Sequence, residues 1–393
     1  MCLRKTDMED KEMKVAVLGF GTVGQGVYGM LAHSKGLEPG PVLVRPGKDN
    51  EPWKVADMNA IVSDASVGAV AEVMGGVEPA FSYCAMALKA GKHVVTSNKA
   101  LVAARGIELA EIAREHGAAF LFSAACGGGV PFLHNLSLAV LSDRIESLGG
   151  ILNGTTNYML DAMQRRGLDY GAALSDAQKL GYAEADPTAD VSGLDALRKI
   201  MLGCAVGFDA LPDEELDREG IESITAADVA DLKKRGLTCR LLARGGRTDG
   251  GVYAYVEPVL FTAAAPECSV LDNFNLARYH GEDSGDIVMI GQGAGRWPTA
   301  SAVLRDLSCV LRGEREMLGA GCVRCAADNE GCVHSYYVRL PEKLVSELPV
   351  KSVKNENGVA RVITEPVSVA SMHAFAAKQR ENGAEIFFAA VEE

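Results

Sequence analysis

The chain has 393 residues, of which 48% are hydrophobic and 23% charged, and its formal net charge at pH 7 is −13. This composition is typical of a soluble globular protein of two or three domains, and the absence of an apolar run of roughly 20 residues excludes a membrane-spanning protein. The acidic balance, without a stripe of Lys and Arg, excludes a nucleic-acid partner, because phosphate contacts need clustered cations.

The start of the sequence and the cysteines indicate where the protein works. Residues 1–20 mix charged and apolar side chains and contain no signal-peptide apolar segment. Ten cysteines without such a segment are interpreted as reduced thiols rather than as a disulfide framework. We therefore expect a cytoplasmic protein.

A strand, a glycine-rich turn and a helical pattern follow one another over residues 13–34. The turn consists of Gly19, Phe20, Gly21, Thr22, Val23 and Gly24. Its first two glycines permit a tight turn and the close approach of a pyrophosphate, and the third lets the helix pack on the strand. The pattern predicts a dinucleotide-binding site, and a glycine-rich turn without a ligand is the alternative.

The end of the second predicted strand, at 42–44, bears on which dinucleotide is bound. An NAD-selective site places Asp or Glu about 20 residues beyond the glycines, where it accepts from the ribose 2′-OH. Arg45 stands near that place with Lys48 beside it, and both favour the 2′-phosphate of NADP. Asp49 and Glu51 are close enough to keep NAD open.

The alternation continues with a strand at 69–74, a helix at 80–90, a strand that ends at Lys99 and a helix over 106–116. Ligands of open α/β sheets bind beyond the carboxyl ends of the strands, so we expect Lys99 to face the cofactor crevice. A surface lysine at a helix start is the alternative.

Three consecutive glycines, 127–129, follow a strand at 119–123. They expose backbone amides and carbonyls and permit the close approach of a ligand. Because they come just before the expected second domain, a flexible hinge is a competing interpretation, and both can hold.

The segment from Gly150 to Lys199 gathers acidic side chains beside turns expected at 154–157 and 181–184. The charged residues of interest are Glu184, Asp186, Asp190, Asp195 and Lys199. Helical spacing from residue 191 onward puts Asp195 and Lys199 one turn apart on the same face. We interpret the segment as a site for a small ligand with an ammonium group. The alternative is an exposed ion pair next to a solvated acidic loop.

Strands at 145–153, 238–244 and 252–261 alternate with helical patterns in a second region. A strand, a glycine-rich turn around Gly293 and a helix over 286–306 then predict a return of the chain to the cofactor side. A tight turn without a ligand is an equal alternative for these glycines.

The composition changes beyond residue 313. Cys322, Cys325, Cys332 and His334 suggest a zinc set, but their spacings are short for one, and we expect no metal. A small β-α-β-α-β module is predicted instead. Its elements are expected at 334–340, 342–347, 359–364, 367–381 and 384–391.

Taken in order, the motifs resemble homoserine dehydrogenase. The matching motifs, in register over about residues 15–311, are GFGTVG, AEVMGG, HVVTSNKAL, CGGGVP, GILNGTTNYML, GYAEADPTADVSGLDALRK, GIESIT and GQGAGRWPTASAVLRDL. The resemblance implies NAD(P)-dependent interconversion of L-aspartate 4-semialdehyde and L-homoserine, in the pathway to threonine and methionine. It implies an α/β fold with a Rossmann-type dinucleotide-binding domain, an α+β substrate and dimerisation domain, and a C-terminal ACT-like module.

The resemblance also implies roles for individual residues. Lys199 would donate the proton to the aldehyde oxygen, and Lys99 would contact both the nicotinamide and the substrate. Glu184 and Asp195 would hold the substrate α-ammonium. The other substrate-binding residues would be Asp190, Thr155, Gly154 and Tyr182. The dinucleotide contacts would include Thr22, Val23, Gly181, Glu184 and Gly293.

The sequence departs from the family in two places. The family usually has Glu at the start of its glycine-rich cation-binding loop, whereas this chain has Ser123, so one charged ligand of a monovalent-cation site is missing. Carbonyls of Cys126, Gly128 and Val130 remain for weak sodium binding. In the tail, residues 340–343 replace the Pro-Gly turn of ACT domains, which leaves threonine feedback open.

The expected domains are 1–134 with 286–312 returning for NAD(P) binding, 135–285 for substrate binding and dimerisation, and 320–393 for the ACT-like module. The family usually forms dimers, so a homodimer is expected. Two other functions stay open. One is an NAD(P)-dependent oxidoreductase acting on another amino-acid semialdehyde, and the other is a non-catalytic NADP-sensing protein.

Overall fold

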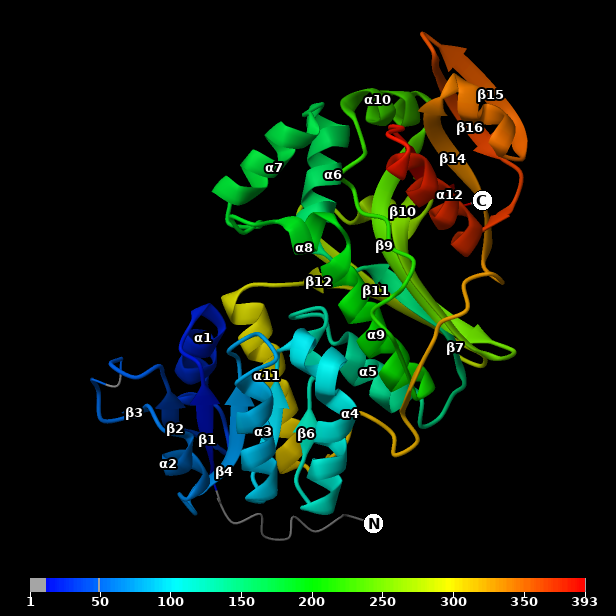
Figure 1. Cartoon of the computed structure of the whole chain (residues 1–393). Helices are drawn as coiled ribbons and strands as arrows, with labels where there is room; N and C mark the ends of the chain where they lie inside the picture. The colour runs from blue at the N-terminus through cyan, green and yellow to red at the C-terminus, as the bar shows by residue number, and fades with distance from the viewer. Residues whose placement is uncertain (1–11, 49, 393) are drawn as a thin grey trace. The chain divides into compact units, whose positions relative to one another are not determined.

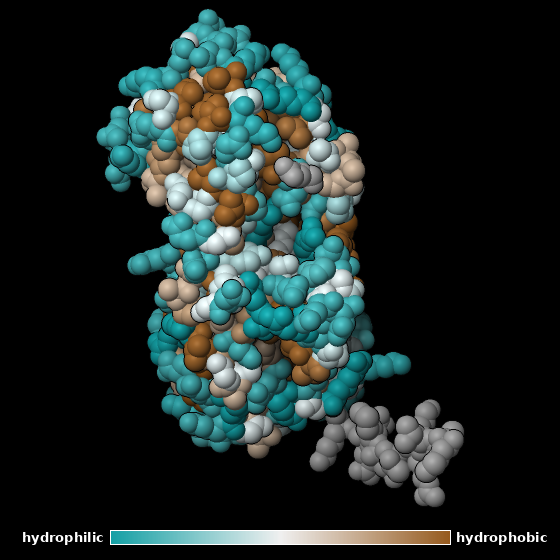
Figure 2. Space-filling view, turned by 90° about the vertical axis from the view of Figure 1, so that its right-hand side faces the viewer, coloured by the Kyte–Doolittle hydropathy of each residue, from teal (hydrophilic) through white to brown (hydrophobic). Residues whose placement is uncertain are grey.

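The computed structural model describes residues 12–48 and 50–392 (Figure 1). The chain separates into two compact units. Unit 1 runs up to His134 and includes Ala294–Gly321, and unit 2 comprises Asn135–Gly293 and the chain from Cys322 onward. No helix within the described ranges combines the length and apolarity that crossing a membrane requires. Figure 2 shows one face of the chain, on which hydrophobic residues reach the surface in patches between hydrophilic ones.

Unit 1 is built on a parallel sheet in the order β3-β2-β1-β4-β5-β6. Its strands are β1 (Met13–Leu18), β2 (Leu37–Leu43), β3 (Lys54–Val55), β4 (Val67–Glu72), β5 (His93–Thr96) and β6 (Phe120–Leu121). Its helices are α1 (Thr22–Leu31), α2 (Met58–Val62), α3 (Ala80–Lys89), α4 (Lys99–Glu115), the 3-10 helix η1 (Ser123–Ala125) and α11 (Arg296–Leu311). This strand order is that of dinucleotide-binding folds, whose ligand crevice lies where the order reverses, between β1 and β4. The predicted fold class is confirmed.

Glycines bring α1 close to its neighbours. A Cβ atom on Gly24 would lie 2.1 Å from the Gly19 carbonyl oxygen, so the first turn of α1 packs directly on the glycine-rich turn. A Cβ atom on Gly26 would lie 3.1 Å from that of Ala300, which shows that α11 packs tightly against α1. The segment that returns to unit 1 therefore fixes the helix after the glycine-rich turn.

The helix predicted over 106–116 begins seven residues earlier. It starts at Lys99, and the side chain of Asn98 caps it by accepting from the Leu101 amide at 3.1 Å. The helical periodicity of the first two turns is weak because both faces are largely buried, and this hid the start.

Unit 2 is built on a mixed sheet in the order β12-β11-β7-β9-β10-β18-β14-β16-β15, with β17 beside β14. Its strands are β7 (Ile145–Ile151), β8 (Ala210–Pro212), β9 (Leu237–Thr248), β10 (Gly251–Thr262), β11 (Phe274–Gly281), β12 (Gly285–Gln292), β13 (Val323–Cys325), β14 (Val333–Pro341), β15 (Val350–Glu356), β16 (Val359–Thr364), β17 (Val367–Ser368) and β18 (Phe387–Val391). Strands β8 and β13 form a separate parallel pair.

The helices accompany this sheet. They are α5 (Phe132–Ala139), which contains the boundary between the units, α6 (Gly154–Arg166), α7 (Tyr170–Lys179), α8 (Thr188–Val191), α9 (Leu194–Phe208), α10 (Ala226–Lys234), α12 (Val369–Glu381) and the 3-10 helices η2 (Pro266–Ser269) and η3 (Glu342–Glu347). Helix α9 packs against β7, β9 and β10. Gly245 of β9 permits this, since a Cβ atom there would lie 2.6 Å from the Cys204 sulfur.

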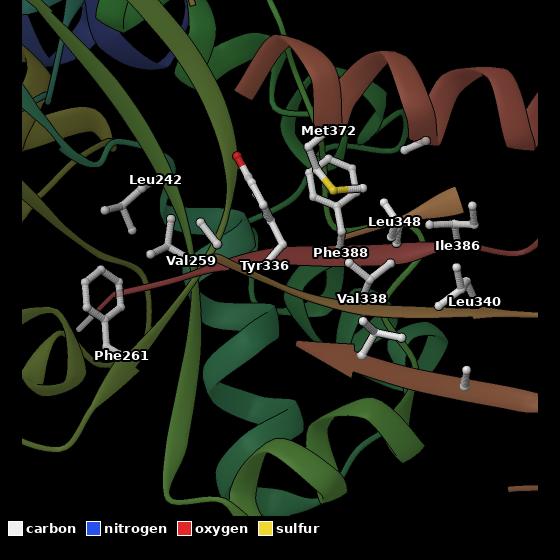
Figure 3. Close-up of a cluster of buried hydrophobic side chains, with 14 of the residues drawn as sticks. Leu242, Val259, Phe261, Tyr336, Val338, Leu340, Leu348, Met372, Ile386 and Phe388 are labelled. Carbon is white, nitrogen blue, oxygen red and sulfur yellow. The ribbon is translucent and has the colours of Figure 1, made fainter. Parts of the chain in front are cut away.

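The C-terminal segment shares its sheet and its core with the rest of unit 2. Strand β18 pairs in parallel with β10 and antiparallel with β14. Figure 3 shows the buried cluster in which Leu242 and Val259, from β9 and β10, lie with Tyr336, Phe388 and Met372, from β14, β18 and α12. Contacts therefore place the segment in unit 2 rather than in a unit of its own.

Several predicted boundaries differ from the structure. Residues 286–292 lie in β12, which pairs with β11, so the return to unit 1 starts at Ala294. Strand β15, missing from the predicted β-α-β-α-β module, lies between η3 and β16. Its side chains are exposed almost throughout, and its sequence therefore lacks the alternation that marks a half-buried strand.

Candidate functional site

Lys199 and Asp195 form a buried ion pair on α9. The Lys199 Nζ atom lies 2.7 Å from the Asp195 carboxylate and donates to the Leu152 carbonyl oxygen at 2.6 Å. Both side chains are less than one tenth exposed. The predicted one-turn spacing is confirmed, and the interpretation as an exposed surface pair is wrong.

Asn153 connects this pair to a second carboxylate. Its side-chain amide donates to Asp195 and to Asp190, each at 2.8 Å. Its side-chain oxygen accepts from the Thr156 amide and so caps α6. Asn153 follows β7 and is the N-cap residue of α6. The same side chain therefore fixes the positions of Asp190 and Asp195 relative to this helix. The sequence analysis missed it, although Asn directly before a helix is a usual capping signal.

Asp190 lies at the end of the short helix α8, partly buried beside Thr155. The Thr155 hydroxyl lies 3.1 Å from the Asp190 carboxylate and 2.6 Å from the Tyr182 carbonyl oxygen. Burial, and next the charge on Asp195, raise the pKa of Asp190 above its ordinary value. Two acids held this close favour a positively charged ligand, which relieves their repulsion.

The residues of the turn predicted at 181–184 differ from one another in how they relate to the site. Gly181 has φ of +77° and ends α7, as predicted. Tyr182 joins the site through its carbonyl, while its ring packs on Tyr158 at 5.1 Å and lines a cavity of about 390 Å³ with Arg165. The Glu184 side chain is exposed, and its carbonyl accepts from a glutamine of α7 at 3.1 Å.

The turn predicted at 154–157 is the first turn of α6. A Cβ atom on Gly154 would lie 2.6 Å from the Asn273 carbonyl oxygen, so glycine is required by packing. Asn275 of β11 lies beside Gly154 and Gly293, and neither polar atom of its buried side chain has a hydrogen-bond partner among the described residues. A buried amide without partners needs a physical explanation, and nothing in the sequence pattern singled this one out.

The glycine-rich turn of unit 1 fits a pyrophosphate. Gly19 has φ of +98°, and no atom lies within 4 Å of a Cβ built on Gly21. Gly21 is the N-cap residue of α1, whose first-turn N–H groups lack intrahelical acceptors. Thr22 and Val23 supply the first of those groups. Phe20 stacks edge-on against Trp53 at 5.2 Å.

Cations gather at the carboxyl end of β2. Arg45 and Lys48 are exposed there, and their role toward the 2′-phosphate of NADP stays a prediction. Lys54, which the sequence analysis missed, lies 5.5 Å from the Phe20 ring centroid and pairs with Glu51 at 3.2 Å. Asp49 lies outside the described residues.

Lys99 begins α4 directly beyond the carboxyl end of β5. A buried network sets the residues before it. The Thr96 hydroxyl donates to Glu72, and the Asn98 side chain donates to the Gly76 carbonyl oxygen at 2.6 Å. Burial raises the pKa of Glu72. The ends of β4 and β5 are therefore tied together beside the crevice.

An arginine side chain of α11 is bonded to the loop after β6. Arg305 donates to the Gly129 carbonyl oxygen at 3.2 Å. Ser123 donates to the buried carboxylate of Asp306 through both its amide and its hydroxyl. The Arg305 guanidinium therefore brings a positive charge to the Gly129 carbonyl of this loop, and weak sodium binding by the carbonyls of Cys126, Gly128 and Val130 stays a prediction.

The remaining predicted positions are Gly293 and the residues of the cysteine-rich segment. A Cβ atom on Gly293 would lie 2.1 Å from the Asn275 side chain, so packing within unit 2 requires glycine there. Within the described chain, Cys322, Cys325, Cys332 and His334 form no group that could hold a metal. His334 instead shares a hydrogen bond of 2.8 Å with Tyr255.

Comparisons with known proteins agree with this geometry. A family model described as homoserine dehydrogenase matches residues 131–308, and one described as the homoserine dehydrogenase NAD binding domain matches residues 19–123. The chain is 37% identical to a homoserine dehydrogenase of Synechocystis over 84% of this chain and 79% of the relative. It is 38% identical to that of Bacillus subtilis, over 78% and 74%.

A solved structure is also similar. The crystal structure of a homoserine dehydrogenase from Thiobacillus denitrificans superposes with a TM-score of 0.86 at 29% identity, covering 97% of this chain and 98% of that one. The likeness therefore extends over both units and includes the C-terminal segment.

Proposed function

Because the chain belongs to the homoserine dehydrogenase family, whose oxidoreductases interconvert L-aspartate 4-semialdehyde and L-homoserine, we propose that Lys199 is the proton donor of this reaction. The observation that supports the role is the short contact of its Nζ atom with Asp195 and Leu152, at 2.7 and 2.6 Å inside unit 2. Family membership decides against another semialdehyde as substrate and against a sensor without activity.

When bound, a reduced nicotinamide supplies the hydride. As negative charge develops on the aldehyde oxygen, the Lys199 ammonium stabilises it and transfers a proton. Asp195 and the Leu152 carbonyl hold the ammonium in one orientation, because each accepts one of its N–H groups. In the reverse direction, the neutral amine takes the proton from the homoserine hydroxyl. Lys99 is proposed to contact the nicotinamide and the substrate.

The acids around Lys199 are proposed to bind the substrate α-ammonium. Asp190 and Asp195 share the Asn153 amide, and each carboxylate keeps acceptor capacity beyond that bond. Glu184 is exposed on the neighbouring turn and is proposed to complete the set, with Thr155, Gly154 and Tyr182 at its margin. A substrate without a free amino group should therefore bind poorly.

The test of this role is the pair of variants Lys199→Ala and Lys199→Arg. Lys199→Ala should abolish turnover and leave NADPH binding, measured by fluorescence titration, nearly intact. Lys199→Arg keeps a cation beside Asp195 but one too weakly acidic to donate a proton, so the protein should stay folded and lose turnover. Turnover at the level of the wild type in either variant would refute the assignment.

The nicotinamide cofactor is proposed to be NADP. Arg45 and Lys48 support this, and Lys54 adds a third cation while its pairing offsets the charge of Glu51. Initial rates of homoserine oxidation with NAD and with NADP, each with and without threonine, test the preference and any feedback together. Arg45→Ala should raise the KM of NADP and leave that of NAD unchanged.

The remaining proposals concern the cellular location, the domains and the oligomeric state of the protein. The chain is proposed to act in the cytoplasm as a homodimer, with an NAD(P)-binding domain, a substrate domain and an ACT-like tail. Val288 and Ile290, 40% and 52% exposed on the edge strand β12, support an interface in unit 2. Light scattering of the double variant Val288→Asp, Ile290→Asp should give a monomer, whereas an unchanged mass would place any interface elsewhere.

A further inference from the structure

Three potential metal ligands meet at the C-terminal end of α11, within unit 1. His134, Cys309 and Glu314 each offer a ligand atom, and these atoms all lie within 4.8 Å of one another. Cys309 is buried, and the other two are partly exposed. Neither the dinucleotide site nor the acids around Lys199 include any of the three.

The end of the helix fixes two of the ligands. The Glu314 amide donates to the Cys309 carbonyl oxygen at 3.1 Å, and the Gly313 amide donates to that of Val310 at 3.0 Å. With Gly313 at φ of +97°, this is a Schellman motif, which brings the side chains at the positions of Cys309 and Glu314 together. The pair is therefore set by backbone geometry before any ion binds.

The third ligand comes from the first turn of α5. The His134 Nδ1 atom lies 3.9 Å from the Cys309 sulfur. In a tetrahedral zinc site, the usual bond lengths put a sulfur and a nitrogen ligand about 3.6 Å apart. A shift of a few tenths of an ångström would therefore bring the two atoms to bonding positions.

The types of the three ligands indicate which metal ion would bind. Sulfur, imidazole and carboxylate ligands together suit zinc, whereas calcium and magnesium prefer oxygen alone.

We propose that His134, Cys309 and Glu314 form a zinc-binding site that joins the end of α11 to the start of α5. Binding forms a metal–sulfur bond and breaks the sulfur–hydrogen bond of Cys309, and the proton passes to the solvent. The Glu314 carboxylate and the thiolate together neutralise the ion. Three protein ligands leave a fourth position for water.

Cobalt titration of the full chain, freed of metal with a chelator, tests the site. One equivalent of Co²⁺ should give a thiolate-to-cobalt charge-transfer band and visible bands of tetrahedral cobalt, and Zn²⁺ should displace it. Cys309→Ser should remove the charge-transfer band. Glu314→Gln, which keeps an acceptor for the fold, should weaken cobalt binding by at least about tenfold. Zinc should raise the melting temperature of the wild type but not of Cys309→Ser.

Cys322→Ser is the matched control, because Cys322 is another buried thiol and belongs to the cysteine-rich segment of unit 2. It should keep the full cobalt spectrum. The proposal is overturned by the absence of a saturable band in the wild type, by an unchanged band in both Cys309→Ser and Glu314→Gln, or by loss of the band in Cys322→Ser.

Discussion

Arg380 of α12 donates two hydrogen bonds to the carboxylate of Glu219, at 2.7 and 2.6 Å. Two residues further along, the Ile221 amide donates to the Val191 carbonyl oxygen at 2.8 Å, next to Asp190. A cation of the C-terminal segment is thus connected, through one short loop, to the backbone that carries a predicted substrate-binding acid. The Glu219 side chain is only 8% exposed, so its carboxylate is shielded from water, whereas the Arg380 side chain is 34% exposed.

Arg380→Gln should therefore weaken substrate binding. It leaves the Glu219 carboxylate buried without its cation. A lost charged hydrogen bond of roughly 1.5–3 kcal/mol corresponds to a rise in the KM of homoserine of between about tenfold and about 150-fold. The KM of the dinucleotide should stay constant. Steady-state kinetics with each substrate test this prediction. The control is Lys354→Gln, which removes an exposed ion pair within β15. An equal rise for both substrates would indicate general unfolding instead.

Asn153→Ala should impair the site more than it impairs the fold. The loss of the cap costs about 1 kcal/mol, whereas Asp190 and Asp195 lose the donor that they share. We expect kcat/KM for homoserine to fall by more than tenfold at a small loss of melting temperature. Asp169→Ala removes the cap of α7 alone and should lose similar stability without the kinetic effect. Equal kinetics in both variants would contradict a role for Asn153 in the site.

The pH dependence of homoserine binding should report on Asp190. Its pKa is raised by burial and by the charge on Asp195, so it becomes protonated at a higher pH than an ordinary aspartate as the pH falls. The KM of homoserine should rise on acidification earlier than the ordinary pKa of 3.8 would predict. Asp190→Asn should raise KM at all pH values and flatten this profile. Asp186→Asn should leave the profile as it is, because the Asp186 carboxylate is exposed and its pKa is lowered.

The stability of unit 1 should decrease as the pH rises through the pKa of Asp306. Burial raises that pKa to about 6 from 3.8. The folded state therefore binds a proton that the unfolded state releases, and ionisation costs stability, in total about 3 kcal/mol above pH 6. Asp306→Asn removes this cost. Its melting temperature relative to the wild type should be higher at pH 8 than at pH 5, and a difference that is constant with pH would show that Asp306 does not titrate in this range.

Much of the fold and part of the site could be predicted from local spacing. Asp195 and Lys199 meet because residues four apart share a helix face, and the turn at Gly19–Gly24 needs glycines at fixed positions in any context. These signals are contained within a few residues. The alternation of strands and helices could likewise be recognised from local patterns, whereas the order of the strands in the parallel sheet came from the structure.

What escaped prediction depends on contacts between distant segments. Asn153 becomes important only because Asp190 and Asp195 fold back onto it, and Asn275 only because Gly154 and Gly293 close around it. The zinc ligands are separated by 175 residues between His134 and Cys309. The exposed strand β15 has no periodicity, so only its pairing with β16 defines it.

The pairing of β18 with β10 has a consequence for how this chain can be shortened. A protein cut after residue 321 would lose β13 to β18. The long, apolar strand β10 would then form the edge of the sheet, and Val259 and Phe261 would become exposed. An unpaired apolar edge strand of this kind forms hydrogen bonds with strands of other chains and causes aggregation. We therefore expect a chain shortened at residue 321 to form insoluble aggregates.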